Sequence, residues 1–239
     1  MTIPEGFNLE EIAGRFAGEL GIPAGDFLAA CRAINFREEF SFLPAGGNAT
    51  VEGYLFPDTY FFKSFGITPS SAIHPMLKRF EEVVLPLWEN YRGKIDLRRK
   101  KWDLYEVLTL ASIVEKEYRL PEERPLIAEV FWNRLKKGLL LESCATVNYV
   151  LKKSQLILSL QDLKIRSPYN TYLYLGLPPG PISNPGLEAV KAVLNPDKGD
   201  YLYFVAAQDN HHVFSKTLGE HLRAQKKYLK INLEKQNLK

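Results

Sequence analysis

The sequence has little of the chemistry that metal sites and disulfide scaffolds use. Its 239 residues include two cysteines, Cys31 and Cys144, and four histidines. The cysteines lie far apart and form neither a Cys-x-x-Cys motif nor a Cys/His ligand spacing, so we expect no structural zinc site. Two unrelated thiols are the favoured interpretation, with a single disulfide as the alternative if the protein is exported.

Histidines gather at one place only, where His211, His212 and His221 come close in the sequence. Adjacent residues of a hairpin project to opposite faces, so His211 and His212 cannot share a ligand sphere. We interpret them as part of a turn and of a surface helix, and we expect no metal and no other cofactor.

An excess of one charge is also missing, because 31 Lys and Arg face 28 Asp and Glu. Nothing therefore demands a nucleic-acid partner, and the basic run at 92–101 is interpreted as a solvated face. The sequence contains no signal peptide and no long apolar run. It opens within an element, so we expect the native protein to continue at its N-terminal side.

Hydrophobic periodicity and turn residues predict an α+β fold. A strand–helix–helix–strand unit is expected over 1–62, followed by a mainly helical part with a small antiparallel hairpin. Asn184 and Pro185 are interpreted as the cap and first position of one helix, and Thr217 with Glu220 as a capping box. The expected helices cover 68–91, 103–119, 121–138, a stretch ending at Leu194, and 218–229, and the hairpin pairs 201–207 with 212–217.

The stretch ASIVEKEYR (111–119) carries two glutamates on one predicted helix. Advancing about 100° per residue from Leu104, Glu115 falls at about 20°, inside an apolar arc, and Glu117 at about 220°, at its boundary. Burial raises the pKa of a carboxyl group, and a protonated glutamate can serve as a general acid. The competing interpretation is structural: Glu115 pairs with a buried arginine or caps a neighbouring element.

Several stretches together resemble the YceG-like (MltG-like) family of endolytic murein transglycosylases. They occur in order over essentially the whole chain, and the long irregular loop at 167–186 is the most specific of them. The stretches are EGYLFPDTY (52–60), ASIVEKE (111–117), FWNRLKKGLLLESCATVNYVL (131–151), SPYNTYLYLGLPPGPISNPG (167–186), YLYFVA (201–206) and HVFSKTLGEH (212–221).

The resemblance implies an enzyme that cleaves peptidoglycan glycan strands internally, between N-acetylmuramic acid and N-acetylglucosamine, and leaves a 1,6-anhydro end. It implies a LysM-like region at 1–62, a catalytic domain at 63–239, and Glu115 as the catalytic glutamate. It also implies one N-terminal membrane-anchoring helix outside this chain, a location at the extracytoplasmic face of the cytoplasmic membrane, and cell-wall synthases as partners.

One stretch departs from the pattern. Many members read L-Q-S/T-D-P-T-V where this chain has Leu141 to Val147, with Cys144 at the position of the usual aspartate and Glu142 at that of the glutamine. No role for an acid at position 144 therefore carries over, and Glu142 adds a carboxylate that could perturb Glu115.

In the implied mechanism Glu115 first donates a proton to the glycosidic oxygen and then accepts one from the C6 hydroxyl of the muramic acid, which attacks C1. The loop at 167–172 offers hydrogen-bonding groups and flat rings for the sugars, with Asn170 as the strongest candidate. The candidate substrate-binding residues are Asn170, Ser167, Tyr169, Thr171, Tyr172, Ser143, Thr146, Glu142 and Glu117.

Two alternatives stay open at this point. A lysozyme-type hydrolase would use Glu115 with a second carboxylate about 5–5.5 Å away if it retains configuration, and Glu142 is the candidate. A non-catalytic peptidoglycan-binding protein would need only the LysM-like region and would leave Glu115 without a task.

Overall fold

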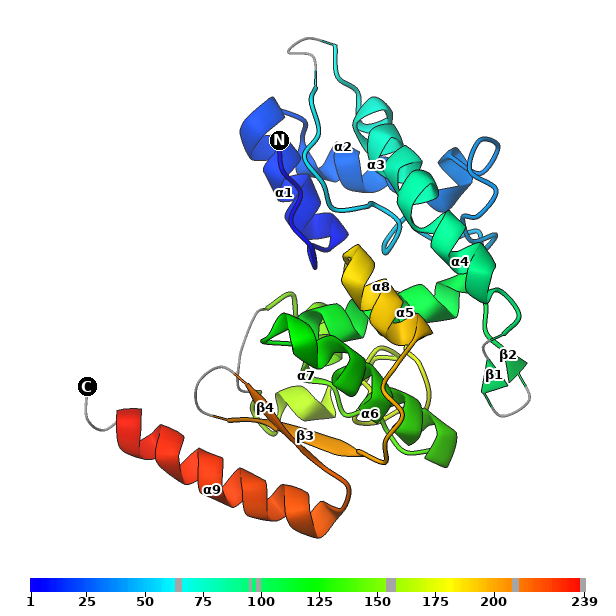
Figure 1. Ribbon diagram of the computed structural model, residues 1–239. Coiled ribbons are helices and arrows are strands. Elements are labelled where there is room, and N and C mark those ends of the chain that lie inside the picture. The colour runs from blue at the N-terminus through cyan, green and yellow to red at the C-terminus, as the bar shows by residue number, and fades with distance from the viewer. Residues whose placement is uncertain (63–65, 95, 98–99, 154–157, 208–210, 237–239) are drawn as a thin grey trace.

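Helices make up about half of the computed structural model, which describes residues 1–62, 66–94, 96–97, 100–153, 158–207 and 211–236. Two short antiparallel hairpins complete an α+β fold, as predicted (Figure 1). The α-helices are α1 (Leu9–Leu20), α2 (Ala24–Ala30), α3 (Pro69–Val83), α4 (Leu85–Tyr91), α5 (Leu104–Glu117), α6 (Arg124–Lys137), α7 (Cys144–Leu151), α8 (Leu187–Leu194) and α9 (Leu218–Gln236), and the strands are β1 (Asp96–Leu97), β2 (Lys100–Lys101), β3 (Tyr203–Ala206) and β4 (His212–Ser215).

Helix α5 lies at the centre of the fold and packs against α6, α7 and α8. Asp103 caps it, and Asp103 and Glu106 form a capping box in which each side chain accepts the other residue's backbone N–H. Every residue from Val107 to Glu115 is buried, including those opposite the apolar arc. The helix is therefore covered all round, and the prediction of one buried face was too narrow.

The N-terminal part keeps the outline of the predicted strand–helix–helix–strand unit. Its two ends meet through the isolated antiparallel bridge Thr2–Thr59, while α1 and α2 form the helical pair between them. The second strand expected in this unit does not form: residues 52–54 make a turn, and Thr50 and Thr59 form isolated bridges. Pro57 lacks the backbone N–H that a strand would use there. The buried apolar residues form one cluster, with members on both sides of residue 62, from Ile3 to Leu194. The division into two domains near residue 62 therefore stays a prediction.

The helical pattern at 68–91 folds into two helices instead of one. Helix α3 ends at Val83, and α4 begins at Leu85 with Pro86 in its first turn. A proline lacks the backbone N–H that a continuous helix would need and is accepted in the first turn of a new one. The break therefore follows from Pro86.

The SNPG turn before α8 connects the N-terminal part to the centre of the fold. Asn184 is fully buried, and its Oδ1 accepts the backbone N–H groups of Gly53 and Leu55, each at 2.9 Å. Its Nδ2 donates to Phe7 O and to Glu52 Oε1. The cap of α8 is Gly186 and not Asn184, so the predicted capping role was wrong.

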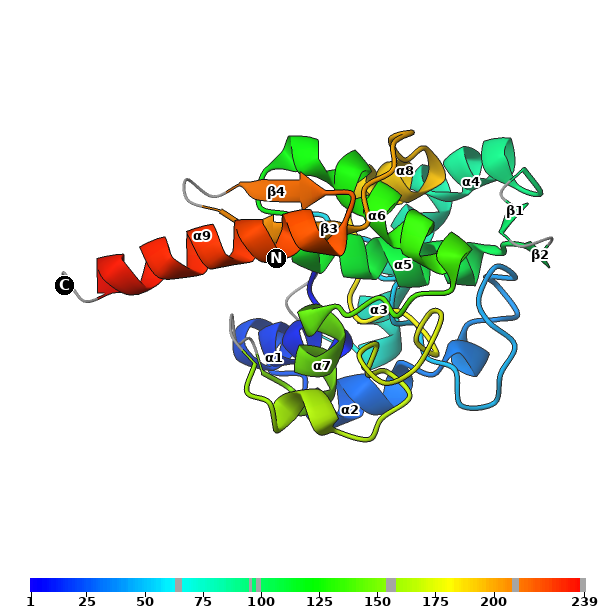
Figure 2. The ribbon, with the colours of Figure 1, turned by 90° about the horizontal axis from the view of Figure 1, so that it is seen from below.

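The C-terminal hairpin and α9 form a separate layer. Strands β3 and β4 pair antiparallel, as predicted, and Phe204 lies opposite Phe214. Of the expected turn at 208–211, residues 208–210 lie outside the described residues. Thr217 and Glu220 form the predicted capping box at the start of α9, which runs seven residues past the predicted end at 229, to Gln236. Figure 2 shows α9 extending away from the body of the molecule.

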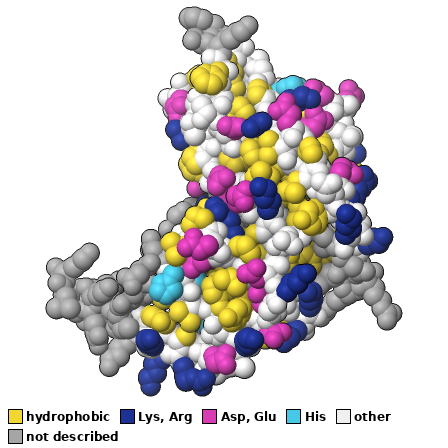
Figure 3. Space-filling model, viewed as in Figure 1, with side chains coloured by type: hydrophobic (Ala, Val, Ile, Leu, Met, Phe, Trp, Pro, Cys, Tyr) yellow, Lys and Arg dark blue, Asp and Glu magenta, His cyan; other side chains and the backbone are white. Residues whose placement is uncertain are grey.

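The distribution of charged side chains and the state of the two cysteines match what the composition led us to expect. Acidic and basic side chains are interspersed on the face drawn in Figure 3. Cys31 is buried, Cys144 is partly buried, and both are free thiols, as the favoured interpretation expected. No helix within the described ranges is long and apolar enough to cross a membrane.

Candidate active-site cleft

A cleft of about 1130 Å³ opens at the C-terminal end of α5. The β3–β4 hairpin and α9 lie on one side of it and α1 and α7 on the other, an arrangement that can be followed in Figure 2. Its volume exceeds the upper end, about 1,000 Å³, of typical small-ligand pockets, which suits an extended polymer. Its ionisable and aromatic lining includes Glu10, Glu11, Lys116, Glu117, Tyr118, Arg119, Arg134, Glu142, Cys144, Tyr149, Lys152, Tyr172, Tyr203, His212 and His221.

Glu117 is the acid that the end of α5 presents to this cleft. It follows Leu110 and Ile113 on the second buried face of the helix, because residues seven and four positions apart lie one above the other. Ser143 Oγ donates a hydrogen bond to Glu117 Oε1 at 2.5 Å, and the backbone N–H of Ala145 donates another. Burial raises the pKa of Glu117 above the ordinary value for glutamate, although these hydrogen bonds oppose the rise.

Glu115 lies elsewhere. Its side chain is buried, as the helical wheel predicted, but it is not among the residues that line the cleft. Its Oε2 accepts the backbone N–H of Gly186 at 3.0 Å, which is the cap position of α8. Burial raises the pKa of Glu115 to about 7. The geometry matches the structural interpretation, in which Glu115 caps a neighbouring element.

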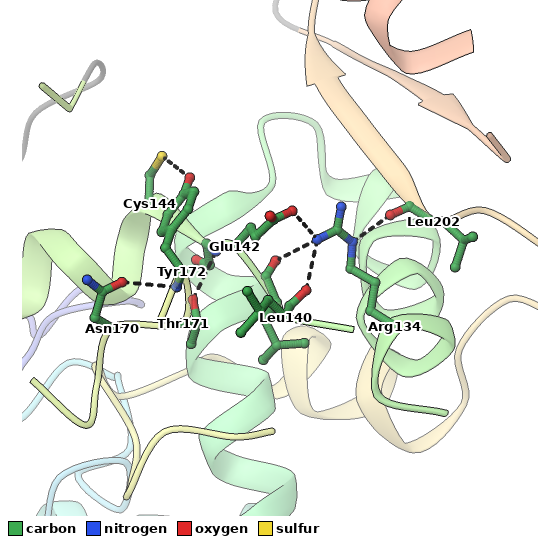
Figure 4. A network of polar contacts seen from close by, with 10 residues as sticks. Arg134, Leu140, Glu142, Cys144, Asn170, Thr171, Tyr172 and Leu202 are labelled. Atoms are coloured by element: carbon green, nitrogen blue, oxygen red, sulfur yellow. Dashed lines mark hydrogen bonds and ion pairs between the residues drawn. The ribbon is translucent and has the colours of Figure 1, made fainter. Parts of the chain in front are cut away.

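Arg134 organises the wall of the cleft at its 140–142 end. Its guanidinium group donates to Leu202 O at 2.6 Å and to Leu140 O at 2.9 Å, and it pairs with Glu142 Oε2 at 2.6 Å (Figure 4). Glu142 lines the cleft, and its backbone has a φ of 53°, an unusual value for this residue type. Arg134 therefore neutralises Glu142 and joins its segment to the strand-bearing layer.

The polar residues behind this wall form a buried network. Thr171 Oγ1 accepts the backbone N–H of Ser143 at 3.0 Å and lies 2.9 Å from Thr146 Oγ1. Ser143, Thr146 and Thr171 are each at most 2% exposed. Thr146 and Thr171 were predicted to bind the substrate, but neither lines the cleft. Ser143 contributes to the cleft through its hydrogen bond to Glu117.

Asn170 has a different role from the predicted sugar contact. It is fully buried, its Nδ2 donates to Leu163 O and Ile165 O, and its Oδ1 accepts the N–H of Tyr172. All three interactions stay within 163–172, so the amide organises the loop. Turn geometry of this kind cannot be inferred from residue types alone.

Asn170→Ala should destabilise the protein by about 1–3 kcal/mol, because it removes the partner of three part-buried backbone groups. Thermal unfolding followed by circular dichroism measures the loss. Asn90→Ala is the matched control: its exposed amide makes one hydrogen bond, to Pro86 O, so its removal should change little. A melting temperature equal for the two variants would contradict the role given to Asn170.

The tyrosines of the same loop divide into two groups. Tyr172 lines the cleft, and its hydroxyl lies 3.0 Å from Cys144 Sγ, so a ring is available there for stacking on a sugar (Figure 4). Tyr169 instead packs against Tyr149, with ring centroids 5.1 Å apart. Ser167 accepts the N–H of Tyr169 at 3.3 Å and does not line the cleft.

The structure therefore brings together Glu117, Glu142, Tyr172 and, one contact behind, Ser143. Arg134, Tyr149 and His212 also line the cleft, although sequence patterns predict no site role for the first two and a turn for the third. Arg134 lies near the end of the predicted helix 121–138, where basic residues are common, so its position gives no sign of its tertiary contacts. Within the part of the chain that is described, no group of three or more His, Cys, Asp or Glu could hold a metal ion.

Comparisons with known proteins agree with the resemblance in the sequence. A profile of the YceG-like family matches residues 1–227. An endolytic murein transglycosylase of Bacillus subtilis is 37% identical and aligns with 98% of this chain, and one of Streptococcus pneumoniae is 36% identical over 86% of it. The chain spans 66% and 40% of the lengths of these two relatives. A crystal structure of a YceG-like protein from Listeria monocytogenes superposes with a TM-score of 0.83 at 35% identity, covering 93% of this chain and 74% of that one.

Proposed function

The chain belongs to the YceG-like family, and from this membership and its cleft we propose that it is a lyase that cleaves peptidoglycan glycan strands internally. The bond broken joins N-acetylmuramic acid to N-acetylglucosamine, and the product carries a 1,6-anhydro end. The observation that carries the proposal is a part-buried glutamate, Glu117, presented to a cleft large enough for a polymer.

In this mechanism Glu117 is the general acid and then the general base. Its raised pKa keeps it protonated at a higher pH than an ordinary glutamate, as proton donation to the glycosidic oxygen requires. The C1–O bond breaks as the C6 hydroxyl of the same sugar attacks C1, and the Glu117 carboxylate takes the proton that this hydroxyl loses. Ser143 Oγ, at 2.5 Å, holds the carboxyl group in place throughout.

We assign the acid to Glu117 and not to Glu115, the residue that the resemblance implied. A general acid must reach the proton it transfers, within about 2.6–3.2 Å or through one water. Glu117 lines the cleft, whereas Glu115 accepts a backbone N–H at the cap of α8 and does not line the cleft. We therefore assign Glu115 a structural role at the start of α8 and assign the proton transfers to Glu117.

The acids that could act as a second carboxylate favour transglycosylation over hydrolysis. Besides Glu117, the described lining of the cleft includes Glu10, Glu11 and Glu142. Glu10 pairs with Lys152, Glu11 accepts the N–H of Asn8, and Glu142 pairs with Arg134. Each is already neutralised or hydrogen-bonded, and intramolecular attack by a hydroxyl needs no second carboxylate.

For the native protein we propose a membrane tether N-terminal to this chain and an extracytoplasmic location, where its substrate lies. There it would terminate or trim nascent glycan strands beside cell-wall synthases. Residues 1–62 would serve as the LysM-like region and 63–239 as the catalytic domain.

Digestion of long uncrosslinked glycan strands tests the proposal. Internal cleavage should yield products of intermediate length early in the reaction, each ending one water lighter than a hydrolysis product by mass spectrometry. Release of disaccharides alone from the outset would contradict internal cleavage, and intact strands after long incubation would favour the non-catalytic alternative.

A further inference from the structure

Glu123 forms a buried contact between the start of α6 and the start of β4. Its Oε1 accepts the backbone N–H of His212 at 2.5 Å, and its Oε2 lies 2.8 Å from the ring Nδ1 of the same residue. Oε2 also accepts the N–H groups of Arg119 and Leu120. One carboxylate thus holds both the backbone and the ring of His212.

This contact determines the orientation of the imidazole. Burial would raise the pKa of Glu123, but the hydrogen bonds from His212 and Leu120 lower it overall, so the group is a carboxylate and can only accept. The proton at this contact is therefore on Nδ1 of His212, and Nε2 is the nitrogen left for another partner. Phe204 and Phe214 pack around the ring, with centroids 5.3 and 6.5 Å away.

The ring that Glu123 holds lines the same cleft as Glu117. Of the two ring nitrogens, Nδ1 makes the contact with Glu123. Arg119 donates its backbone N–H to Glu123 and lies two residues after Glu117. Glu123, which holds Nδ1 of His212, is therefore bonded to the segment that directly follows the acid. A histidine held in this way presents one nitrogen to whatever occupies the cleft.

We propose that His212 is a second residue that touches the glycan strand, with its Nε2 accepting a hydrogen bond from a sugar hydroxyl next to Glu117. Glu123 acts through it as a positioning residue. The assignment rests on the proposed function, because it takes the occupant of the cleft to be a glycan strand. A histidine held by a carboxylate is a recurrent way to fix one ring nitrogen toward a ligand.

A purely structural role is the competing explanation, since the same contacts hold the hairpin against the segment between α5 and α6. Two substitutions separate the roles because each keeps one half of the imidazole. In His212→Asn the amide Nδ2 can replace Nδ1 and keep the bond to Glu123, but nothing reaches the position of Nε2. In His212→Gln the amide reaches that position, but the donor to Glu123 is lost.

Steady-state cleavage and thermal unfolding of both variants test the proposal. Strand contact predicts that kcat/KM of His212→Asn falls at least about tenfold below that of His212→Gln, while His212→Asn keeps the higher melting temperature. A kcat/KM of His212→Asn equal to or above that of His212→Gln would overturn it. His74→Asn is the matched control, since His74 pairs with Glu39 on the exposed N-terminal part.

Binding measured in a Glu117→Gln background separates this proposal from the function it rests on. Added to that variant, His212→Asn should weaken binding of fluorescently labelled, uncleaved strands about five- to tenfold by anisotropy. Unchanged binding would overturn the contact and leave the proposed function in place. Failure of the unsubstituted chain both to bind and to cleave strands would instead overturn the proposed function.

Discussion

Glu117→Gln is expected to lower kcat/KM for glycan-strand cleavage by about 10³-fold, within the range of about 10²–10⁴ that general acid–base catalysis contributes. The amide has the shape of the carboxyl group but can neither donate the proton to the leaving oxygen nor accept one from the C6 hydroxyl. It can still accept the hydrogen bond from Ser143, so the fold should be retained. Product formation measured against time by chromatography gives the rate.

Glu115→Gln is the matched control on the same helix. Its amide oxygen can still accept the N–H of Gly186, so we expect kcat/KM close to wild type and a loss of stability below about 1 kcal/mol. The opposite pattern, with Glu115→Gln inactive at an unchanged melting temperature and Glu117→Gln active, would return the catalytic role to Glu115.

Gly53→Ala is expected to destabilise the protein by about 2–5 kcal/mol. Gly53 has a φ of 87°, a conformation that costs an L-residue energy, and a Cβ there would lie 2.6 Å from Pro181 Cγ. The proline ring belongs to the loop that Asn184 ties to Gly53, so it cannot move aside without breaking that bond. Urea unfolding followed by fluorescence measures the change.

A second glycine gives the control for Gly53→Ala. Gly14 lies exposed within α1, and a Cβ there would meet no atom within 4 Å. Gly14→Ala should therefore stabilise the protein by about 0.5–1 kcal/mol through helix propensity. If both alanine variants changed stability in the same direction, the tight packing of Gly53 against Pro181 would not be the cause.

Local signals in the sequence predicted the helices well. Capping residues and periodicity located α5, α6 and the start of α9, because the side-chain and backbone groups that end a helix are its own neighbours in the chain. Alternating apolar residues likewise predicted the β3–β4 pairing. These features depend on residues a few positions apart.

The candidate site could be predicted only in part, because its geometry depends on distant segments. The helical wheel identified Glu115 as buried but took burial for function; α5 is covered on all sides, so Leu110, Ile113 and Glu117 form a second inner face. Which face meets the cleft is decided by Ser143 and by the hairpin that carries His212, far along the chain.

The same limit applies to the residues predicted to bind sugar. Asn170 was chosen for its polar amide, but the fold uses every polar atom of that amide inside the loop. Arg134 and Glu123 looked like ordinary helix-end charges, and their tertiary partners, Leu202 and His212, lie more than sixty residues away. Long-range pairing of this kind leaves no local signature.

Cleavage of long glycan strands in oxygen-18 water tests most directly whether one glutamate performs both proton transfers without a water nucleophile. We predict that the new ends are 1,6-anhydro ends that contain no oxygen-18, and that Glu117→Gln forms them about 10³-fold more slowly. Reducing ends labelled with oxygen-18, or unlabelled anhydro ends formed by Glu117→Gln at the wild-type rate, would contradict the mechanism.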